Sequence, residues 1–364
     1  MLEVALNFLN KIEEHGFQAY IVGGFVRDYL LGIESNDVDI CTNAKPSDIK
    51  RIFKDNCMPD DEYGSVVVMV KNTRFEVTTF RKEISYVDNR KPDEYEYIDN
   101  LEEDLLRRDF TINTICMDKN KNIIDMLNGR RDLKSMEINA VGNSYNKFSE
   151  DALRILRAVR FATVLDFKLS DDVKNAIIET KHLLSNLSYE RKKEELDKIF
   201  GSIHVKYGVK LLIELGLDEE LELTKLKDIT CFDDIIGIWA LLDVGDIYPF
   251  TKNEKDIMED INNGRNEDIL DPLVIYKYGL YVSTILGDIK GIDRKKITYI
   301  YEQLPIKDRN EIAISGDEIM EILNKEPGAY LKEIIDDVER KIILGELSND
   351  PTVLEEYISK KYTN

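Results

Sequence analysis

The sequence predicts an α/β N-terminal part built on a mixed sheet, followed by a chain that is helical to its end. Two observations predict this organisation. Short apolar runs alternate with amphipathic stretches through the first 135 residues, as expected of strands that alternate with helices. Beyond residue 200 the sequence shows helical periodicity and glycine stops, with almost no strand signal.

Size and composition indicate a globular protein with more than one structural unit. Its 364 residues, 43% of them hydrophobic, can bury a substantial core. No run of about eighteen uncharged apolar residues occurs, which predicts no membrane segment and a cytoplasmic protein. Four scattered cysteines and three histidines show no zinc or disulfide pattern, so the cysteines are expected to fill the core.

The formal net charge of −21 argues against a nucleic-acid partner, because phosphate binding normally needs a basic surface. The charge is unevenly distributed, however. Residues 1–200 contain 30 Lys and Arg against 37 Asp and Glu, whereas residues 201–364 contain 20 against 34. The arginines in particular are concentrated in the N-terminal part, which also carries the motifs.

The elements of the N-terminal part follow from its residue pattern. The predicted strands are the apolar or alternating runs at residues 20–22, 37–39, 65–70 and 74–80. The predicted helices are the amphipathic stretch 1–15, a short helix after the glycine pair Gly23–Gly24, and a helix that begins at Pro46.

The stretch from Ala19 to Thr42 groups the residue types that hold a triphosphate. Gly23 and Gly24 allow backbone N–H groups to approach phosphate oxygens, and the next helix points its positive end at the same anion. Arg27 adds a planar, permanently charged fork. Taken singly, such a glycine pair is more often a plain turn.

Asp37 and Asp39 carry the chemistry of a metal site. Alternation along a strand places both side chains on one face, with Cα atoms about 6.5–7 Å apart. Two carboxylates at this spacing beside phosphates suit Mg²⁺ ions that bridge protein and nucleotide. Glu76 is a candidate third acidic group, or simply a polar strand position. The plain alternative for the aspartate pair is a solvated strand edge.

The stretch GGFVRDYLLGIESNDVDICT resembles the first motif of the class II tRNA nucleotidyltransferase and bacterial poly(A) polymerase family, a branch of the DNA polymerase beta nucleotidyltransferase superfamily. The resemblance implies a nucleotidyltransferase head at residues 1–135, a helical neck at 136–200, and a helical, RNA-binding body and tail at 201–364. It implies addition of C, C and A to the tRNA 3′ end from CTP and ATP, without a nucleic-acid template. Mg²⁺ would be the cofactor, pyrophosphate would leave, and no DNA partner is expected.

The segment LEEDLLRRDFTIN resembles the second motif of that family. Arg108 and Asp109 can hold a ribose, because the carboxylate accepts from a hydroxyl while the guanidinium donates. Recognition of the 2′-OH would select ribonucleotides. A surface ion pair is the alternative. The segment from Asp125 to Leu133, with Gly129 and Asp132, resembles the third motif, which is implied to reorient the two halves of the active site.

Residues 80–97 are polar and aromatic without sustained periodicity, which predicts a solvated surface loop. The resemblance identifies them as the flexible loop that enzymes adding the final adenosine retain. This favours addition of the full C, C and A sequence.

Residues 150–162, EDALRILRAVRFA, predict one amphipathic helix. On it Asp151 and Arg154 are three residues apart and share a face. An acceptor beside a forked donor can hydrogen-bond the Watson–Crick edge of a base, and the resemblance implies that this pair selects C or A. Arg157 and Arg160 can reach the triphosphate. The alternatives are a helical ion pair and a charged helix surface.

Two further features concern the neighbours of this helix. The chain has Asn139 and Lys147 where the family has arginines, which bears on RNA contacts upstream of the helix. Residues 187–200 resemble the fifth motif, implied to brace the selecting helix.

Several functions fit these motifs. The nearest alternatives are a poly(A) polymerase and a partial enzyme that adds only CC or only A. A non-catalytic RNA-binding protein would not need the Asp37 and Asp39 pair. Transfer to a small molecule would not need the long helical tail.

Overall fold

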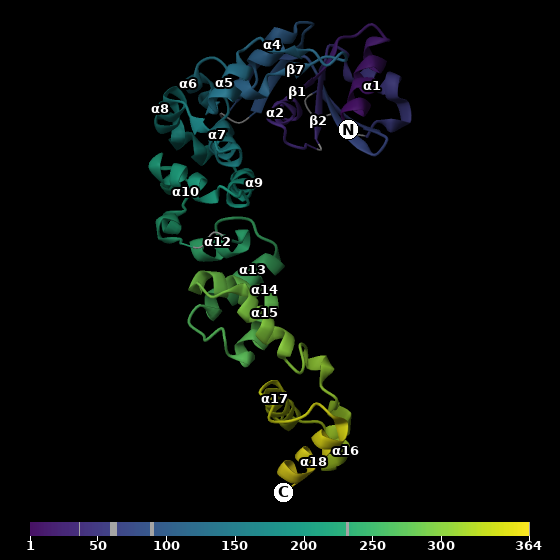
Figure 1. Ribbon diagram of the computed structural model, residues 1–364, viewed down its shortest axis with the longest axis vertical. Coiled ribbons are helices and arrows are strands. Elements are labelled where there is room, and N and C mark those ends of the chain that lie inside the picture. The colour runs from purple at the N-terminus through teal and green to yellow at the C-terminus, as the bar shows by residue number, and fades with distance from the viewer. Residues whose placement is uncertain (36, 59–63, 88–90, 231–232, 364) are drawn as a thin grey trace. The chain divides into compact units, whose positions relative to one another are not determined.

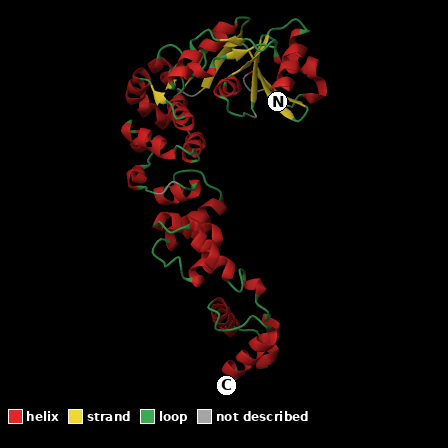
Figure 2. Cartoon of the chain, in the orientation of Figure 1, coloured by secondary structure: helices red, strands yellow, loops and turns green. Residues whose placement is uncertain are grey.

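The computed structural model describes residues 1–35, 37–58, 64–87, 91–230 and 233–363 (Figure 1). The chain forms two compact units, Met1–Leu226 and Lys227–Asn364. Strands occur in the first unit, while the second is built from helices over the residues described (Figure 2). The predicted α/β part followed by an all-helical tail is confirmed.

A six-stranded mixed sheet forms the centre of the first unit, with strand order β3-β4-β2-β1-β7-β8. The strands are β1 (Ala19–Val22), β2 (Val38–Thr42), β3 (Ser65–Val70), β4 (Thr73–Thr79), β7 (Cys116–Met117) and β8 (Ile123–Ile124). The pair β2–β4 is parallel and the other pairs are antiparallel. A parallel pair in an antiparallel sheet is what makes the sheet mixed.

One face of this sheet is covered by α1 (Leu2–Glu13) and α3 (Pro46–Phe53). The ring of Phe8 on α1 stacks on Phe53 of α3 and on Phe75 of β4, with centroids 4.2 and 4.3 Å apart. Helix α3 begins with a proline as predicted, and the Asp48 carboxylate accepts from the Lys45 N–H to cap its first turn. Aromatic side chains therefore form part of the core between this face of the sheet and the two helices.

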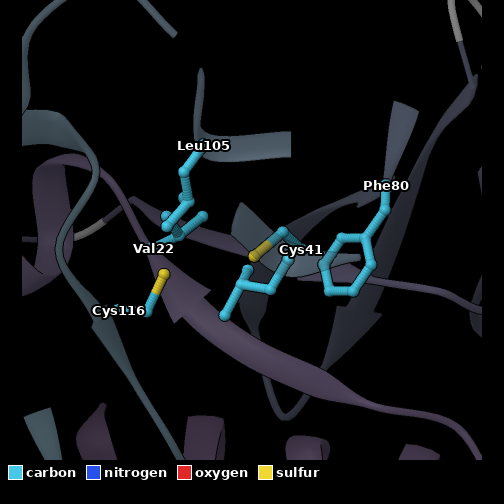
Figure 3. Packing of buried hydrophobic residues seen from close by; sticks show 6 residues of the cluster. Val22, Cys41, Phe80, Leu105 and Cys116 are labelled. Atoms are coloured by element: carbon cyan, nitrogen blue, oxygen red, sulfur yellow. The ribbon is translucent and has the colours of Figure 1, made fainter. Parts of the chain in front are cut away.

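The opposite face is covered in part by α4 (Leu101–Leu106). Leu105 of this helix packs with Val22, Cys41, Phe80 and Cys116, as Figure 3 shows. Both cysteines are buried in this core. Cys231 lies outside the described residues.

Strands β5 (Arg81–Val87) and β6 (Lys91–Tyr97) pair in antiparallel orientation, so the prediction of a surface loop is wrong for these residues. The residues alternate between sides as in any strand, but the less exposed positions Arg81 and Glu83 are charged, while the exposed Ile84 is apolar. In a typical strand the less exposed positions are apolar and the exposed positions are polar. Because the order is reversed here, the sequence does not show the alternation that would predict a strand.

Helices fill the rest of the first unit. They are α2 (Gly24–Leu31), α5 (Gly129–Ser135), α6 (Ser144–Glu150), α7 (Leu153–Leu165), α8 (Asp171–Thr180), α9 (Tyr189–Phe200), α10 (Val205–Glu214) and α11 (Leu217–Glu220). Short 3₁₀ turns lie at η1 (Lys54–Asn56), η3 (Thr111–Asn113), η4 (Lys181–Asn186) and η5 (Thr224–Asp228). Strands β9 (Glu137–Ile138) and β10 (Lys168–Leu169) form a small parallel pair.

The single helix predicted at residues 150–162 is two helices, and this prediction is also wrong. Helix α6 ends at Glu150, and Asp151 has an extended backbone with φ −142° and ψ 108°. The Asp151 carboxylate accepts from the Leu153 N–H at 3.0 Å, outside the helical pattern. Aspartate competes for backbone donors in this way, which favours a helix start over a helix interior.

The second unit contains α12 (Ile235–Leu242), α13 (Lys252–Gly264), α14 (Pro272–Lys290), α15 (Arg294–Gln303), η6 (Arg309–Glu311), α16 (Gly316–Leu323), α17 (Tyr330–Ile343) and α18 (Pro351–Tyr362). Helix α14 is kinked at Gly279, whose φ of 70° breaks the helical path. Trp239 and Ile275 are fully buried in this unit. None of the helices in the described ranges is both long and apolar enough to cross a membrane.

Gly129 offers a test of the packing of α5 on η3. A Cβ atom at this position would lie 2.3 Å from the Thr111 carbonyl oxygen and 2.7 Å from the Ile115 side chain. Gly129→Ala should therefore destabilise the protein by about 2–4 kcal/mol, because backbone must move to make room. Gly316→Ala is the control, since a Cβ there meets nothing within 4 Å. Equal urea midpoints for the two variants would contradict the packing described.

Candidate active site

A cavity of about 820 Å³ opens on the sheet face that carries Asp39. It brings together residues from the glycine turn, from β2 and from the segment around α7. Among the residues predicted to act, those lining it are Gly24, Arg27, Asp37, Asp39, Arg108, Asp109, Asp151, Arg154, Arg157 and Arg160. Its described lining holds eight arginines and one lysine against seven carboxylates, in a chain of net charge −21. The cavity is therefore locally basic.

Gly23 sits at the start of α2 with φ +77°, a conformation that side chains disfavour. A Cβ atom there would lie 3.2 Å from Oδ2 of Asp39. Both the backbone angle and the close approach of this carboxylate therefore require glycine. The turn brings the N-terminus of α2 next to the acidic end of β2.

Asp37 and Asp39 lie on the same face, because the intervening Val38 is buried on the other side of the sheet. Glu76 of β4 is directly opposite Asp39 in the parallel register and also lines the cavity. Burial and the nearby Glu76 charge raise the pKa of Asp39 to about 6, although Arg108 acts in the opposite direction.

The arrangement of these oxygens fits a divalent cation. The repulsion between the half-buried Asp39 carboxylate and the nearby Glu76 carboxylate is reduced when a cation binds between protein and phosphate. Over the residues that the structure describes, no three His, Cys, Asp or Glu side chains form a ready-made metal cluster. A cation bound by the aspartate pair would therefore need further oxygens from a ligand.

Arg108 lies behind the aspartates, where its Nη2 donates to Oδ2 of Asp104 at 3.3 Å. Asp104 is fully buried and also accepts from Nε of Arg107 at 2.9 Å. Burial would raise the pKa of Asp104, but the Arg108 and Arg107 guanidiniums hold it below its usual value. Asp104 thus stays ionised and fixes both arginines at the cavity wall.

A chain of hydrogen bonds crosses the cavity floor from α2 to α7. Nη1 of Arg27 donates to Oδ1 of Asn113 at 2.8 Å, and Nδ2 of Asn113 donates to Oδ1 of Asp109 at 3.2 Å. Nε of Arg157 donates to the other oxygen of Asp109 at 2.7 Å. Despite burial, the Arg157 charge and these hydrogen bonds lower the pKa of Asp109 to about 2. Asn113 is the link that sequence reasoning missed.

Asp151 and Arg154 both line the cavity, but they are not neighbours on one helix face, because the helix break separates them. Nη1 of Arg154 donates to Oε2 of Glu150 at 2.6 Å and to the Lys147 carbonyl at 3.0 Å. Nη2 donates to the Arg107 carbonyl at 3.1 Å. The Arg154 guanidinium is thus fixed by the end of α6 and by the segment after α4.

Helix α9 holds two of the cavity residues through ion pairs. Arg191 lies 3.5 Å from Oδ2 of Asp151, and the nearly buried Glu195 lies 3.2 Å from Nε of Arg160. Burial and the nearby Arg157 charge lower the pKa of Arg160 to about 10. Residues 191 and 195 are four apart and share a helix face, which was the one sequence signal that could have identified them.

Comparisons with known proteins agree with this geometry. Residues 19–139 match the poly A polymerase head domain family. Residues 166–225 match the probable RNA and SrmB-binding site of polymerase A, and residues 252–358 match a family described as tRNA nucleotidyltransferase domain 2, putative. The CCA-adding enzyme of Lactococcus lactis subsp. cremoris MG1363 is 38% identical, over 94% of this chain and 92% of the relative. The chain belongs to the CCA-adding enzyme family.

Other relatives extend this likeness along the chain. The CCA-adding enzyme of Ligilactobacillus salivarius is 36% identical over 98% of this chain and 96% of the relative. The crystal structure of the Bacillus stearothermophilus CCA-adding enzyme with CTP superposes with a TM-score of 0.88 at 30% identity, covering 98% of this chain and 96% of that one. The Thermotoga maritima CCA-adding enzyme with tRNA has the same fold, with a TM-score of 0.69.

Asn113→Ala tests the hydrogen-bond chain of the cavity floor. Arg27 and Asp109 would each lose a buried partner, so we expect the free energy of unfolding to fall by about 1–3 kcal/mol. Asn122→Ala serves as the control, because its side chain pairs with Asp118 in an exposed turn, and we expect a change within about 0.5 kcal/mol. Urea unfolding measures both. An Asn113 variant as stable as the control would show that the chain contributes nothing.

Proposed function

We propose that this protein adds C, C and A to the 3′ end of tRNA, taking CTP and ATP and releasing pyrophosphate. One observation supports this above the others. A single basic cavity holds the aspartate pair, the phosphate-binding types of side chain, and the Asp151 and Arg154 pair. These are the parts needed to bind a nucleoside triphosphate, select its base and place it for attack. We place the activity in the cytoplasm, with its tRNA and nucleotide substrates.

Asp37 and Asp39 would hold Mg²⁺, with Glu76 close enough to contribute to its electrostatic environment. When bound, the ion supplies positive charge to the reacting phosphates. Arg108 stabilises the buried aspartate while the cation is absent, since its charge opposes the raised pKa of Asp39. The glycine turn keeps a side chain from occupying the space between Asp39 and α2.

The triphosphate and ribose would bind along the arginine-lined wall. The backbone at Gly23 and Gly24, together with Arg27, Arg108, Arg157 and Arg160, would hold the phosphates. Asp109, ionised and fixed by Arg157 and Asn113, would accept from the ribose hydroxyl. Because these groups are held before the nucleotide binds, little reorganisation is needed when charge develops on the phosphates.

Asp151 and Arg154 would read the base. The carboxylate accepts from an exocyclic amino group, which both cytosine and adenine carry, and the guanidinium donates to ring acceptors. In the structure each side chain is paired with a protein partner, Asp151 with Arg191 and Arg154 with Glu150. These partners keep the two side chains at the cavity wall.

The helical part beyond residue 200 would bind the tRNA. The family matches at residues 166–225 and 252–358 support this proposal. We retain the division into a catalytic head at 1–135, a neck at 136–200 and an RNA-binding body and tail at 201–364. In sequence, the first compact unit ends at Leu226 and the second begins at Lys227, so the proposed body includes residues of both.

Poly(A) polymerase activity is the second candidate, since residues 19–139 match a poly A polymerase head domain. One assay separates the candidates. The protein is incubated with Mg²⁺ and labelled CTP or ATP on tRNA that lacks CCA, ends in C, or ends in CC. We expect two C additions, then one A, then no more. Unlimited A-tailing would indicate the polymerase, and a stop after CC or a requirement for a CC end would indicate a partial enzyme.

Asp39→Asn should abolish nucleotide incorporation and at the same time stabilise the fold. The raised pKa of Asp39, about 6, means that the folded state binds this proton more tightly than the unfolded state does. Stability is therefore lost as pH rises from about 4 through 6, and asparagine removes that loss. We expect about 1–2 kcal/mol of added stability at pH 7 in EDTA, measured by urea unfolding.

Asp37→Asn is the matched variant. Asp37 is exposed, so its replacement should abolish incorporation without the gain in stability. Retained incorporation in both variants would contradict the metal assignment. Equal stabilities of the two variants would contradict the buried, like-charge environment assigned to Asp39.

Asp151→Ala tests base selection. Loss of the acceptor should reduce kcat/KM for CTP and ATP by about 5- to 100-fold while UTP and GTP change little, because one base-reading contact is worth about 1–3 kcal/mol. Asp171→Ala on α8, whose side chain is 94% exposed, is the control and should behave as wild type. If the ratios of kcat/KM between the four nucleotides do not change, Asp151 does not contribute to base selection.

A further inference from the structure

The aromatic ring of Phe161 on α7 is surrounded by three guanidinium groups. The Cζ atoms of Arg160, Arg27 and Arg157 lie 4.3, 5.3 and 5.4 Å from the ring centroid. Phe161 is half-buried and lines the same cavity. A cation within about 6 Å of a ring face is attracted by the negative charge of that face. These contacts make the ring the common neighbour of three of the four arginines proposed to bind the phosphates.

These arginines come from two elements that are remote in sequence. Arg27 lies on α2, next to the glycine turn, whereas Arg157 and Arg160 lie on α7. Phe161 is one helical turn after Arg157, so their side chains meet on one face. The ring forms a T-shaped pair with the fully buried Phe110, with centroids 5.7 Å apart. The ring is therefore fixed at the place where α2 and α7 face the cavity together.

Each arginine also has a polar partner at its edge. Arg27 pairs with Asp28, Arg157 with Asp109, and Arg160 with Glu195. Through Asn113, Asp109 also links Arg157 to Arg27, whereas Arg160 is held by Glu195 on a different helix. Like charges this close repel. Burial first, and then the nearby Arg157 charge, lower the pKa of Arg160. An aromatic face attracts all three cations and leaves their positive charge in place. A further carboxylate would attract them too, but it would neutralise part of that charge.

We propose that Phe161 is a positioning residue that gathers Arg27, Arg157 and Arg160 into one anion-binding cluster for the triphosphate of the incoming nucleotide. The inference rests on the proposed function for the identity of the ligand. It assigns to the ring a role that is independent of the base. Asp151 and Arg154 would select between nucleotides, whereas Phe161 would set the affinity for the phosphates that all of them share.

Graded fluorination of the ring tests this proposal in the full-length protein. Phenylalanine with one, two or three ring fluorines at position 161 keeps almost the same shape, but its face becomes progressively less negative. We expect the Kd of inorganic tripolyphosphate, measured by calorimetry in EDTA, to rise at each step and to reach about 3- to 10-fold with three fluorines. KM for CTP and for ATP should rise by the same factor, and their ratio should not change.

The same fluorinated residues at Phe8 provide the control. Phe8 is nearly fully buried and stacks on Phe53 and Phe75, so fluorine there should leave tripolyphosphate affinity unchanged. A merely structural role for Phe161 predicts no graded response, because shape is nearly constant along the series. Should the trifluoro protein fail to fold, the monofluoro protein carries the test with a smaller shift.

The possible outcomes separate this proposal from the proposed function. Unchanged Kd and KM along the series, or a changed CTP to ATP ratio with unchanged tripolyphosphate affinity, would overturn the role of Phe161. If fluorination weakens tripolyphosphate binding but the wild type transfers no nucleotide to tRNA, the role of Phe161 holds as an anion-binding role and the proposed function fails.

Discussion

The carboxylates of Asp39 and Glu76 lie side by side on one face of the sheet, and the N-terminal unit is organised around this repulsion. The parallel register of β2 and β4 places the two residues opposite one another. Like charges in that position destabilise a sheet. The Arg108 charge opposes the raised pKa of Asp39, and the buried Asp104 accepts a hydrogen bond from Arg108. The two carboxylates repel each other at the position where a cation and a phosphate would bind. The surrounding ion pairs offset the cost of this repulsion to the fold.

Ion pairs and hydrogen bonds also hold the charged side chains on the other walls of the cavity. Every proposed phosphate-binding arginine has a polar partner on the protein side, provided by α2, α4, η3, α9 or the segment between α4 and η3. Removing one partner from such a network leaves a buried charge uncompensated, which costs more than the pair contributes. The network therefore fixes side-chain direction more than it adds stability. A site that binds a triphosphate before the reaction requires side chains that already point toward the phosphates.

The parts of the site that lie close together in sequence could be predicted, and those that depend on packing could not. The glycine turn, Arg27, Asp37 and Asp39 fall within twenty residues, so local patterns placed them. Asn113 accepts a hydrogen bond from Arg27, which lies 86 residues earlier in the sequence, and no periodicity shows that contact. The break at Asp151 was hidden because the residues around it favour helix, and the outcome depends on one side-chain hydrogen bond to Leu153.

The strong negative charge of the chain, which argued against a nucleic-acid partner, has a different meaning once the cavity is located. Non-specific affinity for polyphosphate follows the overall charge, whereas binding of one triphosphate follows the local potential. Salt screens charges beyond about 8 Å, so a nucleotide in the cavity is affected mainly by the basic lining. A nucleic acid that lies along the surface instead meets a chain of net charge −21. An RNA partner must then be held by specific contacts. That constraint favours a substrate of defined shape, such as the end of a folded tRNA, over any single strand.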